Sequence, residues 1–214
     1  LHSIPKGDAP FITLHVDHLA PASRSNVSSK RYIFAVIDAF TKYVKLYATK
    51  TTNTLEVIRN LRTYFEYYSR PLRIISDRGS CFTSREFEDF MKEQNIQHIK
   101  IATASPQSNG QVERLNRTIL PMIAKLADER NTHWSNVLKT VEFTINNVVS
   151  KATSECPSVL LFGVRQRGTV TDELRNSLEI SGRTNAPREL PRIREQAAKQ
   201  IQKNQCANKR IYDH

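Results

Sequence analysis

Residues 71–80, PLRIISDRGS, contain a short and almost wholly apolar run that ends at Asp77. Such a run is typical of a strand buried between two parallel neighbours, and the Asp-Arg-Gly sequence after it breaks the strand. Because strands and helices alternate around it, the strand is expected to lie inside a sheet covered by helices. The stretch therefore predicts an α/β protein.

Three antiparallel strands are predicted before this run. FITLHVD (11–17) alternates between apolar and polar residues and ends at Asp17. YIFAVID (32–38) and YVKLYAT (43–49) continue as apolar-rich runs joined by a short turn. Together they predict a meander.

A helix is expected to begin near Asn53, because Asn53 and Glu56 have the spacing of a capping box. Pro71 prevents its extension. Five apolar side chains recur on the face predicted to point inward: Leu55, Ile58, Leu61, Phe65 and Tyr68.

Beyond Asp77 the pattern predicts further helices and one more strand. The expected elements are a helix opened by Thr83 and Glu86, with Phe87, Phe90 and Met91 inward, a strand HIKIA (98–102), a loop Ala104–Gly110, a helix from Gln111, and a helix from about His133 to Val149. A meander followed by strand, helix, strand, helix and strand predicts a mixed five-stranded sheet flanked by helices.

Residues 1–164 are expected to form this core, and residues 165–214 a basic, partly helical C-terminal extension or linker. The net charge is +11, and residues 165–214 alone contain 11 Lys and Arg against 6 Asp and Glu. Since Lys and Arg neutralise phosphates and release counterions, nucleic acid is the expected partner of both parts. The alternative is a basic surface that serves solubility alone.

The remaining composition favours a soluble intracellular protein. Apolar residues make up 39% of the chain, and no run approaches the length of a membrane span. The cysteines Cys81, Cys156 and Cys206 lie far apart without metal-ligand spacing, which indicates reduced thiols. His15 and His18 bracket Asp17, and packing is the favoured role for both.

Three acids carry the chemical hypothesis: Asp17, Asp77 and Glu113. Asp17 and Asp77 are predicted at the ends of adjacent central strands, so their side chains are expected at one edge of the sheet. Glu113 is predicted on the first turn of a helix, where an acid meets the helix dipole favourably. Either aspartate could instead serve a turn, because Asp is common at strand ends.

Converging carboxylates repel one another unless cations neutralise them, and hard oxygen ligands select Mg²⁺ or Mn²⁺. Two such ions about 3.5–4 Å apart can drive an in-line displacement at phosphorus. The hypothesis is therefore a metal-dependent centre that cuts phosphodiesters, with Asp17 bridging the two ions, Asp77 completing one site and Glu113 the other.

Asn116 and Arg117 follow Glu113 by three and four residues, so they are expected on the same helix face, within reach of DNA. Asn109 in the preceding loop and Lys125 further along the helix could extend that contact, although an ordinary solvated role is favoured for Lys125. For Asp38, a structural hydrogen-bonding role is favoured over a fourth metal ligand.

Five segments in this order resemble the catalytic core of retroviral and LTR-retrotransposon integrases, most closely of the gypsy type, over roughly residues 5–165. They are HVDHLAP (15–21), VIDAFTKYV (36–44), IISDRGSCFTS (74–84), SPQSNGQVERLNRT (105–118) and NNVVSKATSECPSVLLFG (146–163). Their agreement in order and spacing makes the resemblance specific.

The resemblance implies an RNase H-like fold and a polynucleotidyl transferase that trims the 3′ ends of element DNA and joins them to target DNA. By the family pattern Asp17, Asp77 and Glu113 are the catalytic triad that holds two Mg²⁺ or Mn²⁺ ions. Asn109, Asn116 and Arg117 match positions that contact DNA. The implied partners are double-stranded DNA and further copies of the chain, as a homodimer or higher oligomer, with no membrane. The implied location is the nucleus, with a cytoplasmic particle stage in an active element.

The sequence departs from the family pattern in several places. Ala20 replaces a common Gly, Ala104 and Ser105 replace a common Tyr-His pair, and no His-His-Cys-Cys zinc domain precedes the core. The chain is therefore expected to be a fragment of a longer polyprotein or a core carried by a host gene. Two alternative functions stay open: a domesticated DNA-binding or assembly protein without catalysis, and an RNase H-type nuclease that hydrolyses without joining strands.

Overall fold

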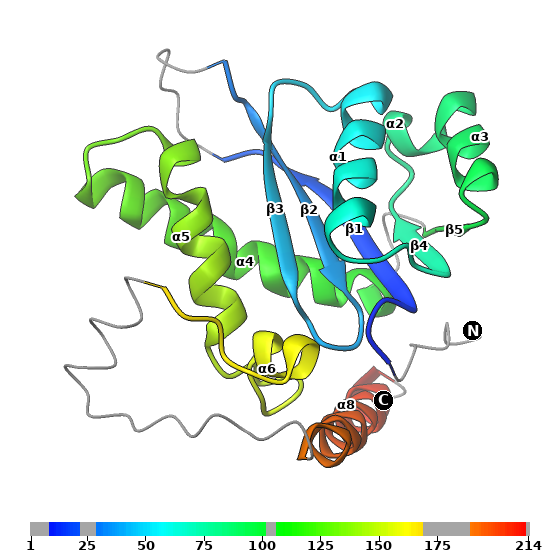
Figure 1. The fold of residues 1–214 in the computed structure, drawn as a ribbon, viewed down its shortest axis with the longest axis vertical. Coiled ribbons are helices and arrows are strands. Elements are labelled where there is room, and N and C mark those ends of the chain that lie inside the picture. The colour runs from blue at the N-terminus through cyan, green and yellow to red at the C-terminus, as the bar shows by residue number, and fades with distance from the viewer. Residues whose placement is uncertain (1–8, 22–28, 102–105, 169–188, 213–214) are drawn as a thin grey trace.

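The computed structural model describes residues 9–21, 29–101, 106–168 and 189–212, without the side chains of residues 106–116 and 205–212. A five-stranded sheet stands at the centre, with helices on both faces (Figure 1). The strands are β1 (Thr13–Leu19), β2 (Tyr32–Asp38), β3 (Val44–Thr49), β4 (Arg73–Ser76) and β5 (Gln97–Lys100); the helices are α1 (Thr54–Tyr67), α2 (Ser80–Thr83), α3 (Arg85–Glu93), α4 (Pro106–Glu129), α5 (Trp134–Asn147), α6 (Pro157–Phe162) and α8 (Leu190–Tyr212).

The strand order is β3-β2-β1-β4-β5. β1, β2 and β3 pair antiparallel, whereas β4 pairs parallel with both β1 and β5. The mixed sheet, its meander, and a buried strand between two parallel neighbours are therefore confirmed. This topology is the RNase H-like fold.

Alternation along the strands separates two hydrophobic cores, because successive side chains point to opposite faces of a sheet. On one face Leu14 and Val16 of β1 pack with residues of α1 and α3. On the other face Leu19 packs with α4 and α5, including the fully buried Ile119 and Trp134. Burial of each large apolar side chain contributes about 1.5–3 kcal/mol, so both faces hold the sheet in place.

The start of α1 agrees with the predicted cap, because the Asn53 side chain accepts a hydrogen bond from Glu56 N at 2.8 Å. The return half of the capping box does not form, since the Glu56 carboxylate accepts from Lys50 N and Thr51 N instead. The prediction that Leu55 points inward is wrong: it is 67% exposed. The buried stripe runs through Val57, Leu61 and Tyr64, and a residue two positions away lies on nearly the opposite side of a helix.

Two predicted boundaries after Asp77 are also wrong. Thr83 ends the short helix α2, and Ser84 caps α3 by accepting from Phe87 N. α4 begins at Pro106, so residues 106–110 are helical and not a loop. Proline suits the first helical position because its fixed φ matches the helix and its missing N–H has no partner to lose there, which offsets the loop-forming composition.

The helical part expected within residues 165–214 is present as α8, which lies beside α6 (Figure 1). Ala197 is buried, and the Asn204 side chain donates to Ala152 O. α6 itself ends at Gly163, whose φ of +80° gives the left-handed C-cap that favours glycine. Among the described residues, no helix is both long and apolar enough to span a bilayer.

Candidate active site

Asp17 and Asp77 occupy matching positions on neighbouring parallel strands. The register of β1 and β4 pairs Leu14 with Ile74 and His15 with Ile75. Continued by two residues, this register sets Asp17 opposite Asp77, which directly follows β4. Since adjacent strands lie about 4.8 Å apart, carboxylates at matching positions can approach one shared ion.

Asp17 belongs to the sheet face that α4 covers. On β1, Leu14 and Val16 face α1, whereas Leu19 packs in the cluster of α4 and α5. Asp17 has the parity of Leu19, so it faces α4. α4 also contacts β1 directly, and Figure 1 shows it crossing that face of the sheet.

The environment of Cys81 agrees with this proximity. Burial raises the pKa of the Cys81 thiol to about 11, and the negative charges of Asp77 and Asp17 act in the same direction. A thiol can sense both carboxylates only if both lie near it.

The Asp77 side chain is held in place by the backbone that follows it. Its Oδ1 accepts a hydrogen bond from Gly79 N at 2.9 Å. A Cβ at position 79 would lie 3.0 Å from the same oxygen. Glycine therefore permits a close approach of the backbone to this carboxylate. The backbone conformation of Gly79, with φ of −54°, is one that any residue can adopt.

The prediction that Asp17 ends its strand is wrong. β1 continues to Leu19, and the Asp17 carboxylate accepts from His18 N at 2.8 Å. The extra residues arise because β2 pairs with β1 as far as Leu19, beyond the point where the parallel partner β4 has ended.

Glu113 lies well inside α4 and not on its first turn, because the helix begins at Pro106. The helix dipole therefore does not stabilise the charge of Glu113 as expected, since the effect of the dipole fades within the first turn. Its side chain lies outside the described residues, as do those of Asn109 and Asn116. Asn109 belongs to α4 and not to a loop.

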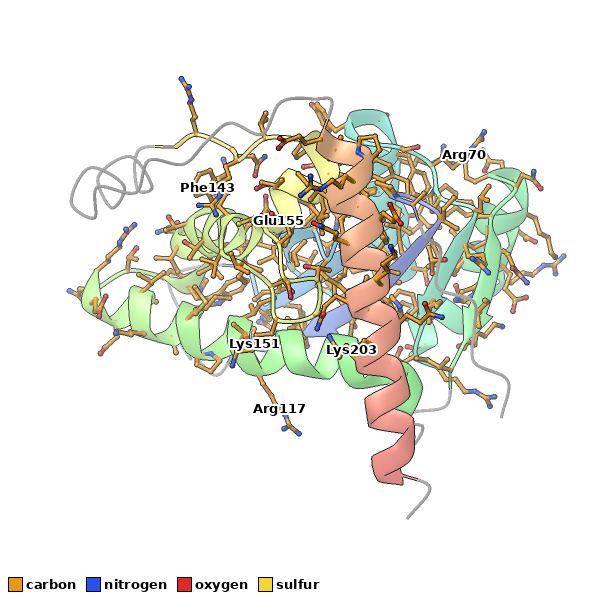
Figure 2. All side chains as sticks on the ribbon, turned by 90° about the horizontal axis from the view of Figure 1, so that it is seen from below. Arg70, Arg117, Phe143, Lys151, Glu155 and Lys203 are labelled. Carbon is orange, nitrogen blue, oxygen red and sulfur yellow. The ribbon has the colours of Figure 1, made fainter. Side chains whose placement is uncertain are left out.

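Arg117 is exposed and projects from α4 away from the sheet (Figure 2). Lys125 forms an exposed ion pair with Glu129 at 3.7 Å, in keeping with an ordinary solvated residue. Asp38 is fully buried and accepts hydrogen bonds from Phe11 N and Thr41, which is the structural role favoured for it.

His18 packs as expected, with its ring 5.2 Å from that of Phe34 and 5.6 Å from that of Phe82. Burial lowers its pKa to about 4, despite the opposing charge of Asp77. Among the described side chains, no three His, Cys, Asp or Glu residues form a metal-binding group. Two hard carboxylates, Asp17 and Asp77, do fit Mg²⁺ or Mn²⁺ in donor type.

An open cavity of about 530 Å³ lies between the start of α1 and α2, and neither acid belongs to its lining. Its lining includes Ser80 and Cys81, which closely follow Asp77, and the basic side chains Arg31 and Lys50. Sequence reasoning missed these two basic residues. The signal was available in the hairpin of β2 and β3, since Tyr32 pairs with Thr49 and so brings the flanking positions together.

Residues 8–106 match the family model described as integrase core domain. The chain contains an integrase core domain. The resemblance to retroviral and LTR-retrotransposon integrase cores is thereby confirmed.

The integrase core has relatives among viral and transposon polyproteins. It is 34% identical over 155 residues to a Pro-Pol polyprotein of feline foamy virus, a match covering 72% of this chain and 13% of that protein. It is 26% identical over 159 residues to the transposon Tf2-3 polyprotein of Schizosaccharomyces pombe, covering 73% of this chain and 12% of that one. The integrase core thus matches only a small part of each relative.

Solved structures share the fold of this integrase core. A simian T-cell lymphotropic virus intasome, in complex with PP2A regulatory subunit B56 gamma, matches with a TM-score of 0.65 and 23% identity, over 78% of this chain and 59% of that one. The trimeric form of the HTLV-2 integrase catalytic core domain, in complex with magnesium, matches with a TM-score of 0.59 and 22% identity, over 70% and 95%.

Proposed function

We propose that this integrase core is a metal-dependent polynucleotidyl transferase that processes the 3′ ends of element DNA and joins them to target DNA. The observation that carries the proposal is the matching register of Asp17 and Asp77 on neighbouring parallel strands, with Asp17 on the sheet face covered by α4. α4 also contains Glu113, the third proposed ligand.

Asp17, Asp77 and Glu113 would hold Mg²⁺ or Mn²⁺, two ions for each site. Ions held there neutralise charge at the reacting phosphate and polarise the attacking and leaving oxygens. The HTLV-2 core structure contains magnesium, which favours this cofactor class. The protein contributes a fixed pair of carboxylates, because the sheet ladder orders Asp17 and Gly79 N orders Asp77.

The DNA backbone would run along the end of the sheet at which β1 and β4 end and β2 begins. Arg31 and Lys50 on the cavity wall place positive charge at this end of the sheet, and Arg117 places positive charge on the outward side of α4. We propose double-stranded DNA, as element ends and target, for this surface, Asn109 and Asn116 being further contacts. Because the matched structures include an intasome and a trimeric core, we also propose that copies of the chain assemble on DNA, in the nucleus.

The decisive test uses purified protein, Mn²⁺ and a branched DNA substrate that reports both cleavage and joining. Wild type is expected to yield recombinant strands, and Asp77→Asn none. Asp89→Asn is the matched control, because Asp89 is an exposed carboxylate on α3 and should leave activity unchanged.

Three other outcomes would contradict the proposal. Cleavage without recombinant products would indicate a nuclease that does not join strands. DNA binding with no chemistry in either wild type or Asp77→Asn would indicate a non-catalytic DNA-binding protein. Equal loss in Asp77→Asn and Asp89→Asn would show that activity does not depend specifically on the proposed site.

A further inference from the structure

Ser76 and His98 form a chain of two hydrogen bonds, here called the relay, that ends on the main-chain O of Asp77. The Ser76 hydroxyl, on the last residue of β4, donates to Asp77 O at 2.8 Å. The same Oγ lies 2.9 Å from Nε2 of His98 on β5. Ser76 is 2% exposed, so these contacts are made away from bulk water.

The protons in this relay can be assigned from its geometry. A hydroxyl has one hydrogen, and that of Ser76 goes to Asp77 O, so Oγ must accept from the N–H of His98 Nε2. Nδ1 of His98 is then unprotonated, in agreement with its burial and its lack of a hydrogen-bond partner among the described residues. Burial, with the charge of Lys100, lowers the pKa of His98 to about 4, which favours the neutral ring.

Neighbouring side chains fix the imidazole. The Phe87 ring contacts it edge to face at a centroid distance of 5.0 Å. The pairing of β4 with β5 ends at Ser76, whose backbone O accepts from Ile101 N at 2.9 Å. Asp77 lies beyond this pairing, and its O accepts a hydrogen bond from the Ser76 side chain.

We propose that His98 and Ser76 are positioning residues for Asp77, and that their relay sets the direction in which its carboxylate meets the metal. The inference rests on the proposed function, because it assumes that Asp77 is a ligand. The relay binds the main-chain O of Asp77, and Gly79 N binds Oδ1 of its side chain. Outer partners that orient a ligand typically affect metal affinity or activity by 10–100-fold.

The test measures Mn²⁺ affinity of the metal-free protein, by electron paramagnetic resonance of free Mn²⁺, together with kcat and KM for strand transfer. His98→Phe and Ser76→Ala are each expected to weaken Mn²⁺ binding and to lower kcat about ten- to hundredfold, with little change in KM for DNA. His98→Gln is expected to stay within a few fold of wild type, since its amide nitrogen can still donate to Ser76 Oγ.

Phe87→Leu is the matched control, because it disturbs the packing of the same imidazole and leaves its donor intact. It should lower thermal stability and retain Mn²⁺ affinity. The inference would be overturned if His98→Phe and Ser76→Ala both fold and bind Mn²⁺ with wild-type affinity. It would also be overturned if His98→Gln lost as much Mn²⁺ affinity and kcat as His98→Phe. Asp77→Asn separates the two failures. If it weakens Mn²⁺ binding while His98→Phe and Ser76→Ala do not, only the relay inference fails; if it leaves Mn²⁺ binding unchanged, the proposed function fails as well.

Discussion

Asn146 of α5 binds both backbone groups of Val44 on the edge strand β3. Its Oδ1 accepts from Val44 N and its Nδ2 donates to Val44 O, both at 2.8 Å. Glu142, one turn earlier, accepts from Leu46 N and from Lys45 Nζ at 2.7 Å. Helix α5 therefore takes the place of a further strand at this edge, where unpaired N–H and C=O groups would otherwise invite another chain.

Asn146→Ala is expected to destabilise the fold by about 2–6 kcal/mol, because two buried backbone groups lose their partners at about 1–3 kcal/mol each. Urea unfolding followed by the fluorescence of Trp134, the single tryptophan, measures the loss. Asn136→Ala is the control on the exposed side of the same helix. Equal midpoints for the two variants would show that the Asn146 contacts contribute little.

Asp38 predicts a pH dependence of stability. Burial raises its pKa above the ordinary value of 3.8, although hydrogen bonds from Thr41 and Phe11 N oppose the shift. Because the folded state then binds the proton more tightly, ionisation of Asp38 costs stability above the raised pKa. That cost is relieved as the pH falls through the raised pKa toward 3.8.

The comparison of wild type with Asp38→Asn isolates this effect, since asparagine does not titrate there. The difference in unfolding free energy should shift in favour of wild type as the pH falls from about 7 to about 4. A constant difference over that range would mean that Asp38 has the same proton affinity in the folded and unfolded chain.

The sheet could be predicted from the sequence because buried strand positions are occupied by apolar residues in a regular pattern. The apolar run at residues 72–76 indicated a strand between parallel neighbours, and β4 is one. Leu55 was misassigned because an apolar residue two positions from the buried stripe satisfies a loose pattern and still faces solvent. The start of α4 was missed because Pro106, Asn109 and Gly110 suggest a loop, whereas proline at a first helical position favours a helix.

The placement of Asp17 and Asp77 on adjacent parallel strands could be predicted, whereas the contacts that support them could not. Asp17 and Asp77 could be found because each follows or ends an apolar run at the same sheet edge. The relay through Ser76 and His98 depends on which side chains of β4 and β5 meet across the sheet, and no local pattern records that pairing. Arg31 and Lys50 were missed for the same reason, since hairpin register brings them to one cavity.

The contacts of Arg194 predict that α8 stays packed against α6. Its guanidinium donates to Leu160 O at 2.9 Å and Leu161 O at 3.0 Å, near the end of α6. Hydrogen bonds to charged groups contribute about 1.5–3 kcal/mol, so Arg194→Met should raise amide hydrogen exchange in α8 about ten- to hundredfold. Arg192→Met is the control, because Arg192 is exposed on the same turn. Similar exchange in both variants would show that α8 is held by other contacts.

Gly79→Ala should separate activity from stability. The added Cβ would lie 3.0 Å from Asp77 Oδ1 and 3.5 Å from the Phe82 ring, so the carboxylate must move. The backbone at position 79 suits alanine, and replacing glycine at a compatible position stabilises by about 0.4–1 kcal/mol through the unfolded chain. We expect strand transfer and Mn²⁺ affinity to fall about tenfold or more, as for a displaced ligand, while the urea midpoint stays the same or rises.

Thr83→Ala, an exposed change at the end of the same helix α2, should alter neither quantity. A Gly79→Ala protein with wild-type Mn²⁺ affinity and activity would show that the Asp77 carboxylate needs no fixed position against Gly79. A large loss of stability would instead mean that the close contact with Asp77 supports the fold. The expected pattern, a protein no less stable that binds Mn²⁺ poorly, arises only if the narrow approach of backbone to carboxylate serves the site.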